Sequence, residues 1–438
     1  MHRQGSRRPL LDRPWQESAP PPAPSTPAGT SIPRQRATGA DLARLQAAHP
    51  MLDAVIDQID RRQIRIGQQW LADFASCNYL GFDLEPEIIE AVPGYLARWG
   101  THPSWSRLLG SPRLYDEIEA ELTGLLGADD TLLLPTITLI HMSVIPVLAA
   151  GGAVFLDARA HKTIYDGCVS ATATGAALER FRHDDPGHLE QLLRACDRYP
   201  RLICLDGVNS MTGNIPPLAE FARIARQHGA QLYVDDAHGF GIIGERSPGE
   251  LCDYGSSGNS VVRYFGESYQ DLILVGGFSK AYSSMLAFVA CPTSVKNLLK
   301  VAAPPYLYSG PVPVASLATA VAGLKVNAER GDTIRAGLHR KTARVLDGLR
   351  QLNVATPNRT GTPVIEVPLA NPDDIDAVGR YLFDRGIYVT LAAYPLVPRS
   401  QVGFRIQVTA TNTDAEITHL LQVLQEVAEQ FPLQPAQQ

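Results

Sequence analysis

The sequence has no C-x-x-C pair and no long apolar run, and these absences argue against several classes of protein. Its six cysteines are scattered along 438 residues, which suits reduced thiols inside a cell better than a disulfide framework. No apolar run reaches the length of a membrane span, and the N-terminus has no apolar secretory core. A net charge of −6 without a basic run argues against a nucleic-acid or membrane-surface partner. We therefore expect a soluble, cytoplasmic protein.

The first 42 residues differ in composition from the rest of the chain. They are rich in Pro, Ala, Ser and Arg and poor in aromatic residues, so they cannot bury enough apolar surface to offset the entropy of ordering. We predict a disordered Pro-rich tail over 1–42, with an organelle transit peptide as the alternative. The whole chain is 45% apolar and 19% charged, which is ordinary for a globular protein and sufficient for two domains.

Short apolar runs that end in polar residues or glycine recur through the middle of the chain. Such runs are typical of buried parallel strands, and they lie at 131–135, 153–158, 202–207, 231–236 and 272–277. Helical patterns separate them, such as 112–128, which has one apolar face and Gly127 as a stop signal, and 216–229, which opens with prolines. This alternation predicts an α/β fold in which helices flank a mostly parallel sheet.

The pattern changes after about residue 305. A loop precedes a long helical stretch that ends near residue 352, and strand-like segments follow at 361–369 and 404–410. Helical patterns cover 371–386 and 413–431, and the second begins with Thr413 and Glu416 at the spacing of a capping box. We predict an N-terminal segment over 43–95, a large domain over 96–305 and a smaller C-terminal α/β domain over 306–438.

The stretch Tyr233–Arg246, "YVDDAHGFGIIGER", contains a G-x-G-x-x-G pattern but makes a poor dinucleotide site. A pyrophosphate would meet the carboxylates of Asp235 and Asp236, and the residues after Gly244 make a poor start for a helix. A carboxylate at a strand end suits instead a protonated ring nitrogen, as in pyridoxal phosphate. That cofactor also needs a lysine, and Lys280 follows the next predicted strand.

This stretch, followed by "GGFSKA", resembles the α-oxoamine synthases, which are pyridoxal 5'-phosphate enzymes. Further segments are similar to the motifs of that family in the same order: "SCNYLGF" (76–82), "SRLLGSPRLYDEIEAEL" (106–122), "HKTIYDG" (161–167), "DGVNSMTGNIPPL" (206–218) and "FRIQVTA" (404–410). The resemblance covers about residues 45 to 430. It implies a fold-type I pyridoxal-phosphate enzyme.

The resemblance also implies roles for individual residues. Lys280 would form the Schiff base with the cofactor and then remove the α-proton of the substrate. Asp235 would hold the pyridine nitrogen, His238 would bind the ring hydroxyl, and His161 would stack on the ring and act in catalysis. The remaining residues implied in cofactor binding are Ser210, Thr136, Ile137, Thr138, Ser279 and Ser309, the last reaching the neighbouring subunit of a homodimer. The residues implied in substrate binding are Arg405, Asn78 and Ser210.

Several positions depart from the family pattern. Thr136-Ile137-Thr138 stands where the family commonly has a Ser-Gly-aromatic turn for the phosphate, and Gly277 replaces a usual threonine. Asp236 is interpreted as a structural residue, and His141, on an apolar helix, as a packed one. These departures favour an enzyme of specialised biosynthesis.

The resemblance implies a decarboxylating condensation of a small amino acid with an acyl thioester, giving an α-amino ketone. The thioester would be carried by coenzyme A or an acyl carrier protein, and no metal is implied. Two alternatives stay open: amino transfer or aldol-type cleavage with the same cofactor, and a catalytically degenerate subunit that pairs with an active partner.

Overall fold

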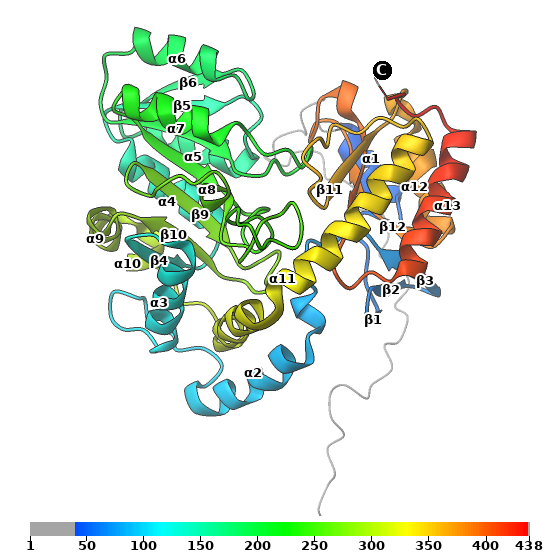
Figure 1. Ribbon diagram of the computed structural model, residues 1–438, viewed down its shortest axis with the longest axis horizontal. Coiled ribbons are helices and arrows are strands. Elements are labelled where there is room, and N and C mark those ends of the chain that lie inside the picture. Colours follow the sequence, from blue (N-terminus) through cyan, green and yellow to red (C-terminus); the bar gives the residue numbers. More distant parts are fainter. Residues whose placement is uncertain (1–39, 437–438) are drawn as a thin grey trace, which may run out of the picture.

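The computed structural model describes residues 40–436, and its largest sheet has seven strands (Figure 1). In spatial order the strands are β4 (Asp130–Leu134), β10 (Ala287–Cys291), β9 (Leu272–Gly277), β8 (Gln231–Asp235), β7 (Arg201–Asp206), β5 (Ala153–Asp157) and β6 (Ala177–Phe181). Neighbours from β9 to β6 pair in parallel, and β10 runs antiparallel to both β4 and β9. The predicted α/β fold with a mostly parallel sheet is therefore confirmed.

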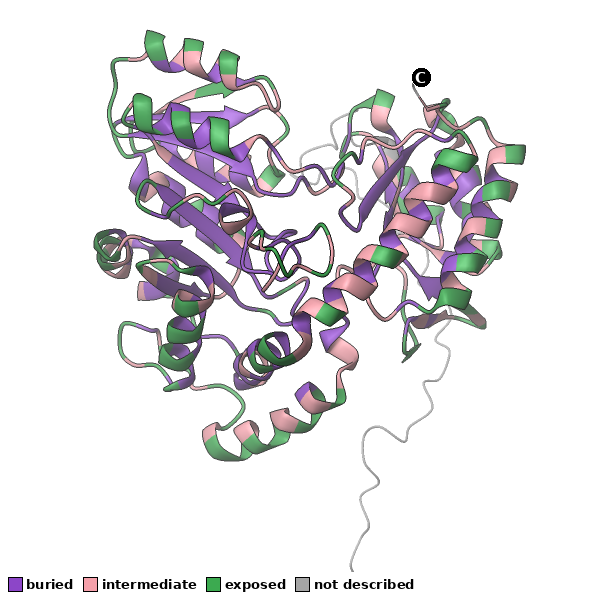
Figure 2. Ribbon diagram, in the orientation of Figure 1, coloured by how far each residue is buried: buried purple, intermediate pink, exposed green. Residues whose placement is uncertain are grey.

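Both faces of this sheet are buried because successive strand residues point to opposite sides. In β8, Leu232 and Val234 join one hydrophobic cluster, while Tyr233 joins a second cluster on the other face. The helices that pack in the first cluster include α3 (Leu114–Leu126), α6 (Pro186–Ala195) and α7 (Leu218–Gln227). Those of the second cluster are α4 (Ile137–Leu148), α5 (Lys162–Thr172), α9 (Thr293–Ala302) and α10 (Pro304–Leu307). Figure 2 shows the buried sheet between helices whose outer faces are exposed.

Two smaller sheets lie on the other side of the molecule (Figure 1). One contains β1 (Gln58–Asp60), β2 (Gln63–Ile66), β3 (Gln69–Asp73) and β12 (Ile387–Tyr388); the other contains β11 (Val364–Pro368), β14 (Gly403–Gln407) and β13 (Thr390–Ala392). Because β3 pairs with β12, the N-terminal segment is hydrogen-bonded to the C-terminal part of the chain. The domain boundaries given above stay a prediction.

The remaining helices connect and cover these sheets. They are α1 (Ala40–Ala48), α2 (Pro86–Trp99), α8 (Val261–Tyr264), α11 (Val314–Gln351), α12 (Ile375–Asp384), α13 (Asp414–Gln430) and the short 3-10 helices η3 (Phe82–Leu84), η4 (Pro372–Asp374) and η5 (Arg399–Gln401). The long helix α11 contacts α2, α3 and α13, so it runs from the large sheet to the smaller ones (Figure 1). The predicted capping box at Thr413 and Glu416 is present at the start of α13. Most of the tail expected at 1–42 lies outside the described residues, and α1 begins within its last three positions.

The glycines after β8 serve the packing of a turn. A Cβ atom on Gly239 would lie 2.0 Å from Oδ1 of Asp236, and one on Gly244 would lie 1.9 Å from the carbonyl oxygen of Ser256. The residues that follow Gly244 form turns and no helix. This motif therefore offers no helix N-terminus at which a phosphate could bind. Among the described residues, no helix combines the length and apolarity that crossing a membrane requires.

Candidate active site

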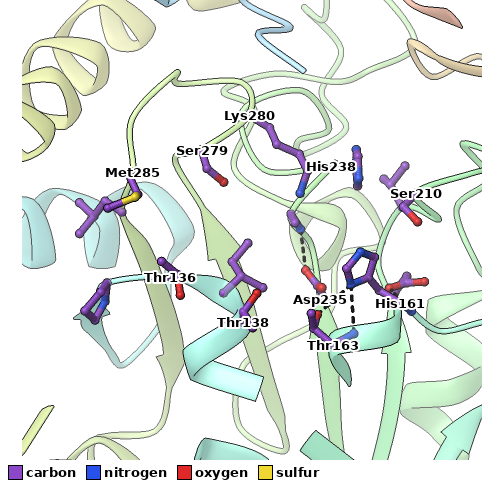
Figure 3. A pocket seen from close by; sticks show the side chains of 16 residues that line it. Thr136, Thr138, His161, Thr163, Ser210, Asp235, His238, Ser279, Lys280 and Met285 are labelled. Carbon is purple, nitrogen blue, oxygen red and sulfur yellow. Dashed lines mark hydrogen bonds between the residues drawn. The ribbon is translucent and has the colours of Figure 1, made fainter. Parts of the chain in front are cut away.

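A pocket opens where β7, β8 and β9 end and where α4 and α5 begin (Figure 3). This is the edge of an open α/β sheet at which ligands commonly bind. The implied site residues that line it are Thr136, Ile137, Thr138, His161, Ser210, Asp235, His238, Ser279 and Lys280. The structure thus brings into one pocket residues that span almost 150 positions of the chain.

Asp235 is a buried carboxylate held in its ionised form. Its Oδ2 lies 2.9 Å from Nε2 of His141, and its Oδ1 accepts a hydrogen bond from the backbone N–H of Ala237 at 2.9 Å. Burial alone would raise the pKa of Asp235, but His141 and then Lys280 and His161 oppose this effect and bring the pKa to about 2. Asp235 can therefore serve as a permanent anionic partner for a cationic ring nitrogen.

His238 lines the pocket with an imidazole whose Nε2 carries no proton. Its Nδ1 lies 2.8 Å from the hydroxyl of Tyr79, and that hydroxyl donates its single proton to Oε1 of Gln407 at 3.0 Å. Nδ1 must therefore carry the proton and donate it to Tyr79. Burial, followed by Lys280 and Arg405, holds the pKa of His238 well below its ordinary value, so the ring is neutral. Its Nε2 is then an acceptor for a hydroxyl such as that of the cofactor ring.

His161 caps the N-terminus of α5. Its Nδ1 accepts from the backbone N–H of Thr163 at 3.3 Å and meets the Thr163 hydroxyl at 2.8 Å, while its own backbone N–H donates to Oδ1 of Asp206 at 3.2 Å. These bonds fix the imidazole at the pocket wall (Figure 3). Asp206 is paired in register with Asp235 on the neighbouring strand; burial and then Asp235 raise its pKa well above the ordinary value.

Lys280 lies on the turn that follows β9. The backbone N–H of Phe278 donates to the carbonyl of Leu286 at 2.8 Å, and that of Ser283 donates to the carbonyl of Lys280 at 3.0 Å, so the turn is closed on itself. The side chain of Lys280 is half-buried and points into the pocket (Figure 3). It is close enough to help lower the pKa values of Asp235 and His238.

The N-terminus of α4 closes one end of the pocket. Thr136 is its N-cap, and the Thr136 hydroxyl accepts from the backbone N–H of Leu139 at 3.2 Å, which leaves the hydroxyl proton free to donate. With the free N–H groups of the first turn, this end suits a phosphate. A Cβ atom on Gly277 would lie 2.5 Å from Cδ1 of Ile137, so the isoleucine fills the space that a side chain at position 277 would need.

The donors and acceptors of the pocket fit pyridoxal phosphate. Asp235 suits the ring nitrogen, Nε2 of His238 the ring hydroxyl, and Lys280 the aldehyde carbon. The end formed by Thr136 and Thr138 suits the phosphate. The set contains one amine, one ionised carboxylate and one anion site, as this cofactor requires.

Three implied residues lie outside the lining of this pocket. Arg405, on β14, donates from Nη1 to the carbonyl oxygen of Ser210 at 2.5 Å, so it borders the pocket through Ser210. Asn78 donates to Oδ2 of Asp83 at 3.0 Å, and Ser309 lies on the loop before α11. The roles implied for these three residues stay predictions.

The interpretation of His141 as a merely packed residue is incomplete. The ring is fully buried, but Nε2 bonds Asp235, and Nδ1 lies 2.8 Å from the hydroxyl of Tyr233. The apolar pattern of α4 carries no signal for this contact. Asp236, as expected, lies outside the pocket lining and accepts from the backbone N–H of Val261 at 3.0 Å.

The chain matches known proteins over most of its length. Residues 73–424 match the family described as aminotransferase class I and II. An 8-amino-7-oxononanoate synthase from Cellvibrio japonicus is 32% identical over 82% of this chain and 87% of its own length. A serine palmitoyltransferase from Caulobacter vibrioides is 29% identical over 88% of this chain and 90% of its own length.

A solved structure supports the same family. Serine palmitoyltransferase from S. paucimobilis, which carries a bound compound of pyridoxal phosphate and myriocin, superposes with a TM-score of 0.82 and 26% identity. The match covers 90% of this chain and 96% of that one. The expected fold-type I architecture is confirmed by this likeness and by the family match.

Proposed function

Since this chain belongs to the α-oxoamine synthases, which are pyridoxal-phosphate-dependent acyltransferases of the class I and II aminotransferase family, we propose that it condenses a small amino acid with an acyl thioester. The thioester loses its thiol, the amino acid loses CO2, and the product is an α-amino ketone. The observation that carries this proposal is the convergence of Lys280, Asp235, His238 and His161 on one pocket.

Different residues of the pocket would hold different parts of the cofactor. When bound, pyridoxal phosphate supplies an electron sink that stabilises negative charge on the α carbon of the amino acid. Asp235, whose own pKa is about 2, would keep a proton on the ring nitrogen. His141 holds Asp235 in place, and His161, which Thr163 and Asp206 fix, would cover the ring.

Lys280 is the group that moves the proton. Its amine would hold the aldehyde carbon of the cofactor. Because Lys280 lines the pocket, Nζ would also be the group that removes the α-proton of the amino acid and later returns a proton to the product. No other amine lines the pocket among residues 40–436, so this role falls to Lys280.

Arg405 would bind the carboxylate of the amino acid. Its Nη1 is already held by the carbonyl of Ser210, while its Nε is buried and has no hydrogen-bond partner among the described residues. A carboxylate that reaches this side of the guanidinium would satisfy Nε with a charge-assisted bond. Asn78 precedes Tyr79 in the chain, and the Tyr79 hydroxyl bonds both His238 and Gln407, which lies on β14. Asn78 is therefore next to the same region.

We place this enzyme in the cytoplasm, in specialised biosynthesis. All six cysteines are free, which suits a reducing compartment. Ile137 in the phosphate turn and Gly277 at the end of β9 distinguish this part of the protein from the usual family pattern. The homodimer implied by the family would bring Ser309 of one subunit to the phosphate end of its partner.

A substrate panel tests this function. Purified holoenzyme is supplied with glycine, alanine or serine, together with acyl thioesters of different chain length or with 2-oxo acids, and free thiol and new amino acids are measured. We expect thiol release to require both an amino acid and a thioester. If a 2-oxo acid supports amino transfer while no thioester is consumed, the enzyme is an aminotransferase and the proposal is wrong.

A further inference from the structure

Glu366 is a buried carboxyl group to which the reaction described above gives no role. It lies on β11, it is 1% exposed, and neither carboxylate oxygen has a hydrogen-bond partner among residues 40–436. A buried carboxyl without a partner is costly unless a cation or a proton satisfies it. The position of Glu366 therefore calls for a cation within reach of its side chain.

Arg405 is the cation that lies directly opposite Glu366. The two residues are paired in register on the antiparallel strands β11 and β14, so their side chains leave the sheet on the same face. Cβ atoms of directly opposed residues lie about 4.5–5.5 Å apart, a gap that both of these long side chains can span. Nε of Arg405 is buried and likewise has no hydrogen-bond partner in the described part of the chain. The Glu366 carboxylate can therefore reach the Nε edge of this guanidinium.

The Arg405 guanidinium is also within electrostatic reach of the reacting pocket. Its charge helps to lower the pKa values of His161 and His238, which both line that pocket (Figure 3). Its Nη1 donates to the carbonyl oxygen of Ser210, another residue of the pocket lining. The same charge helps to lower the pKa of Glu366. Arg405 therefore couples Glu366 to the pocket.

The cavity beside Glu366 holds further groups that carry or can carry charge. Those that line it with Glu366 are Arg159, His183, Arg350 and Arg359. Arg159, from the loop between β5 and α5, is the first of the groups that lower the pKa of Glu366, and Arg405 is the second. Burial outweighs both and raises this pKa to about 7. Glu366 therefore changes its charge near neutral pH, and among these cations Arg405 alone has a proposed role in binding substrate.

Two carboxylates would compete for one edge of the Arg405 guanidinium. Because Ser210 engages Nη1, Nε and Nη2 are the neighbouring donors that can bind a carboxylate side-on. Resting on the proposed function, in which Arg405 binds the carboxylate of the amino acid, we propose that Glu366 is a positioning residue that competes with the substrate. Its carboxylate pairs with Arg405 in the resting enzyme, and the amino acid displaces it while Glu366 takes up a proton from solvent.

This displacement gives amino-acid binding a pH dependence of definite sign. Below pH 7 Glu366 is neutral, so Arg405 is free for the substrate. Above pH 7 Glu366 is ionised, and the incoming carboxylate then takes its cation and adds a second negative charge, which raises the pKa of Glu366 and makes it bind a proton. Affinity for the amino acid should therefore fall as the pH rises above 7, by up to about tenfold per pH unit.

The test uses the cofactor-loaded enzyme without any thioester. Glycine, alanine and serine are titrated at pH 6 and pH 8, and the absorbance of the bound cofactor gives the Kd. Glu366→Gln cannot ionise, so it should bind the amino acid as tightly as the unchanged protein at pH 6 and roughly tenfold more tightly at pH 8. Glu90→Gln, which changes an exposed carboxyl on α2, is the control and should match the unchanged protein at both pH values.

Calorimetry in buffers of different ionisation enthalpy counts the protons that binding takes up. At pH 8 the unchanged protein should take up close to one proton more per bound amino acid than Glu366→Gln does. The amide of the same amino acid lacks the carboxylate, so the two proteins should not differ with it. Glu366→Asp keeps an ionisable group and should restore part of the difference, which a merely structural role of Glu366 does not predict.

The outcomes separate this inference from the proposed function. The inference is overturned if the unchanged protein and Glu366→Gln show the same pH dependence of Kd or the same proton uptake, or if Glu366→Gln binds the amino acid more weakly at both pH values. Thiol release together with any of these results leaves the proposed function standing. The predicted pH dependence and proton uptake without thiol release from any thioester support the inference and show that the proposed condensation is wrong.

Discussion

At the scale of single residues, the contact between His141 and Asp235 sets the electrostatics of the site. His141 is the first of the groups that lower the pKa of Asp235 against the effect of burial. His141→Leu would remove this bond with little change in volume. The pKa of Asp235 should then rise, the ring nitrogen should lose part of its proton, and kcat should fall roughly 10- to 100-fold.

The measurement is the pH dependence of kcat together with the absorbance titration of the bound cofactor. His141→Asn keeps an N–H donor at this position and should show a smaller effect in both. If His141→Leu leaves the titration unchanged, the histidine is only a packed residue.

Glu366 should lower the stability of the ligand-free protein at neutral pH and above. Burial raises its pKa to about 7, although Arg159 and then Arg405 lower it. The neutral carboxyl is tolerated below the ordinary pKa of 4.5, and stability is lost as the pH rises from 4.5 through 7, because ionisation is then favoured only in the unfolded chain. This rise of the Glu366 pKa from 4.5 to about 7 corresponds to about 3 kcal/mol of unfolding free energy.

Glu366→Gln should therefore raise the free energy of unfolding at pH 8 by about 3 kcal/mol and change it little at pH 4.5. Urea unfolding at both pH values measures this, with Glu90→Gln, an exposed carboxyl on α2, as the control. The cationic and titratable groups that face the same cavity are Arg159, Arg350, Arg359 and His183. If Glu366→Gln leaves the free energy of unfolding at pH 8 unchanged, these groups already compensate the charge of the Glu366 carboxylate.

At the scale of elements, the first residue of α4 packs against the end of β9. Ile137 occupies the space into which a side chain at position 277 would extend. Gly277→Thr should therefore overpack this contact and cost roughly 1–3 kcal/mol of unfolding free energy. In the double variant Ile137→Ala/Gly277→Thr the cost should be largely recovered, which a double-mutant cycle measures as a coupling energy above about 1 kcal/mol.

Gly124→Thr is the control for this cycle because no atom lies within 4 Å of a Cβ at that position. Retention of the cofactor during gel filtration gives a second readout. Additive effects of the two substitutions would show that the two positions are independent.

The elements that the sequence predicts are those with a single strong pattern. β4, β5, β7, β8 and β9 are apolar runs that end at a polar residue or glycine, and their carboxyl ends place Asp235 and Lys280 in the pocket. β6 carries Glu179 and Arg180 on the exposed edge of the sheet, so its pattern resembles a surface segment. β10 follows the turn of Lys280 directly, and its five apolar residues alone do not distinguish a strand from a short buried segment.

Side-chain contacts across the fold are the part that the sequence cannot predict. His141 reaches Asp235 from a helix 94 positions away, and nothing in the apolar pattern of α4 marks it. Glu366 is unpaired only because β11 places it inside a cavity, which a strand pattern does not show. Motifs thus predict the residues that we propose to hold the cofactor, whereas the groups that tune them depend on packing between distant segments.

At the scale of the whole molecule, the pocket is expected to be completed by a second copy. Leu109, in the turn before α3, and Tyr308, directly after α10, are 78% and 79% exposed in the single chain. We expect a homodimer in which Ser309 serves the pocket of the partner. Light scattering measures the mass, and a fully active monomer would contradict this arrangement.

Complementation gives a sharper test of the shared site. Lys280→Ala lacks its amine, and Ser309→Trp should block the pocket of the partner, so each variant alone should be inactive. A mixed dimer contains one pocket with both Lys280 and an unchanged Ser309, and mixing the two should restore activity. No recovery after exchange of subunits would show that Ser309 does not act across the interface.

The most direct test of the central claim is the ratio of the two leaving products. Holoenzyme is given an amino acid labelled in its carboxyl carbon together with the acyl thioester that supports thiol release, and labelled CO2 and free thiol are counted in the same reaction. A decarboxylating condensation releases them in equal amounts, and Lys280→Ala releases neither. Thiol without CO2, or CO2 without thiol, would contradict the account.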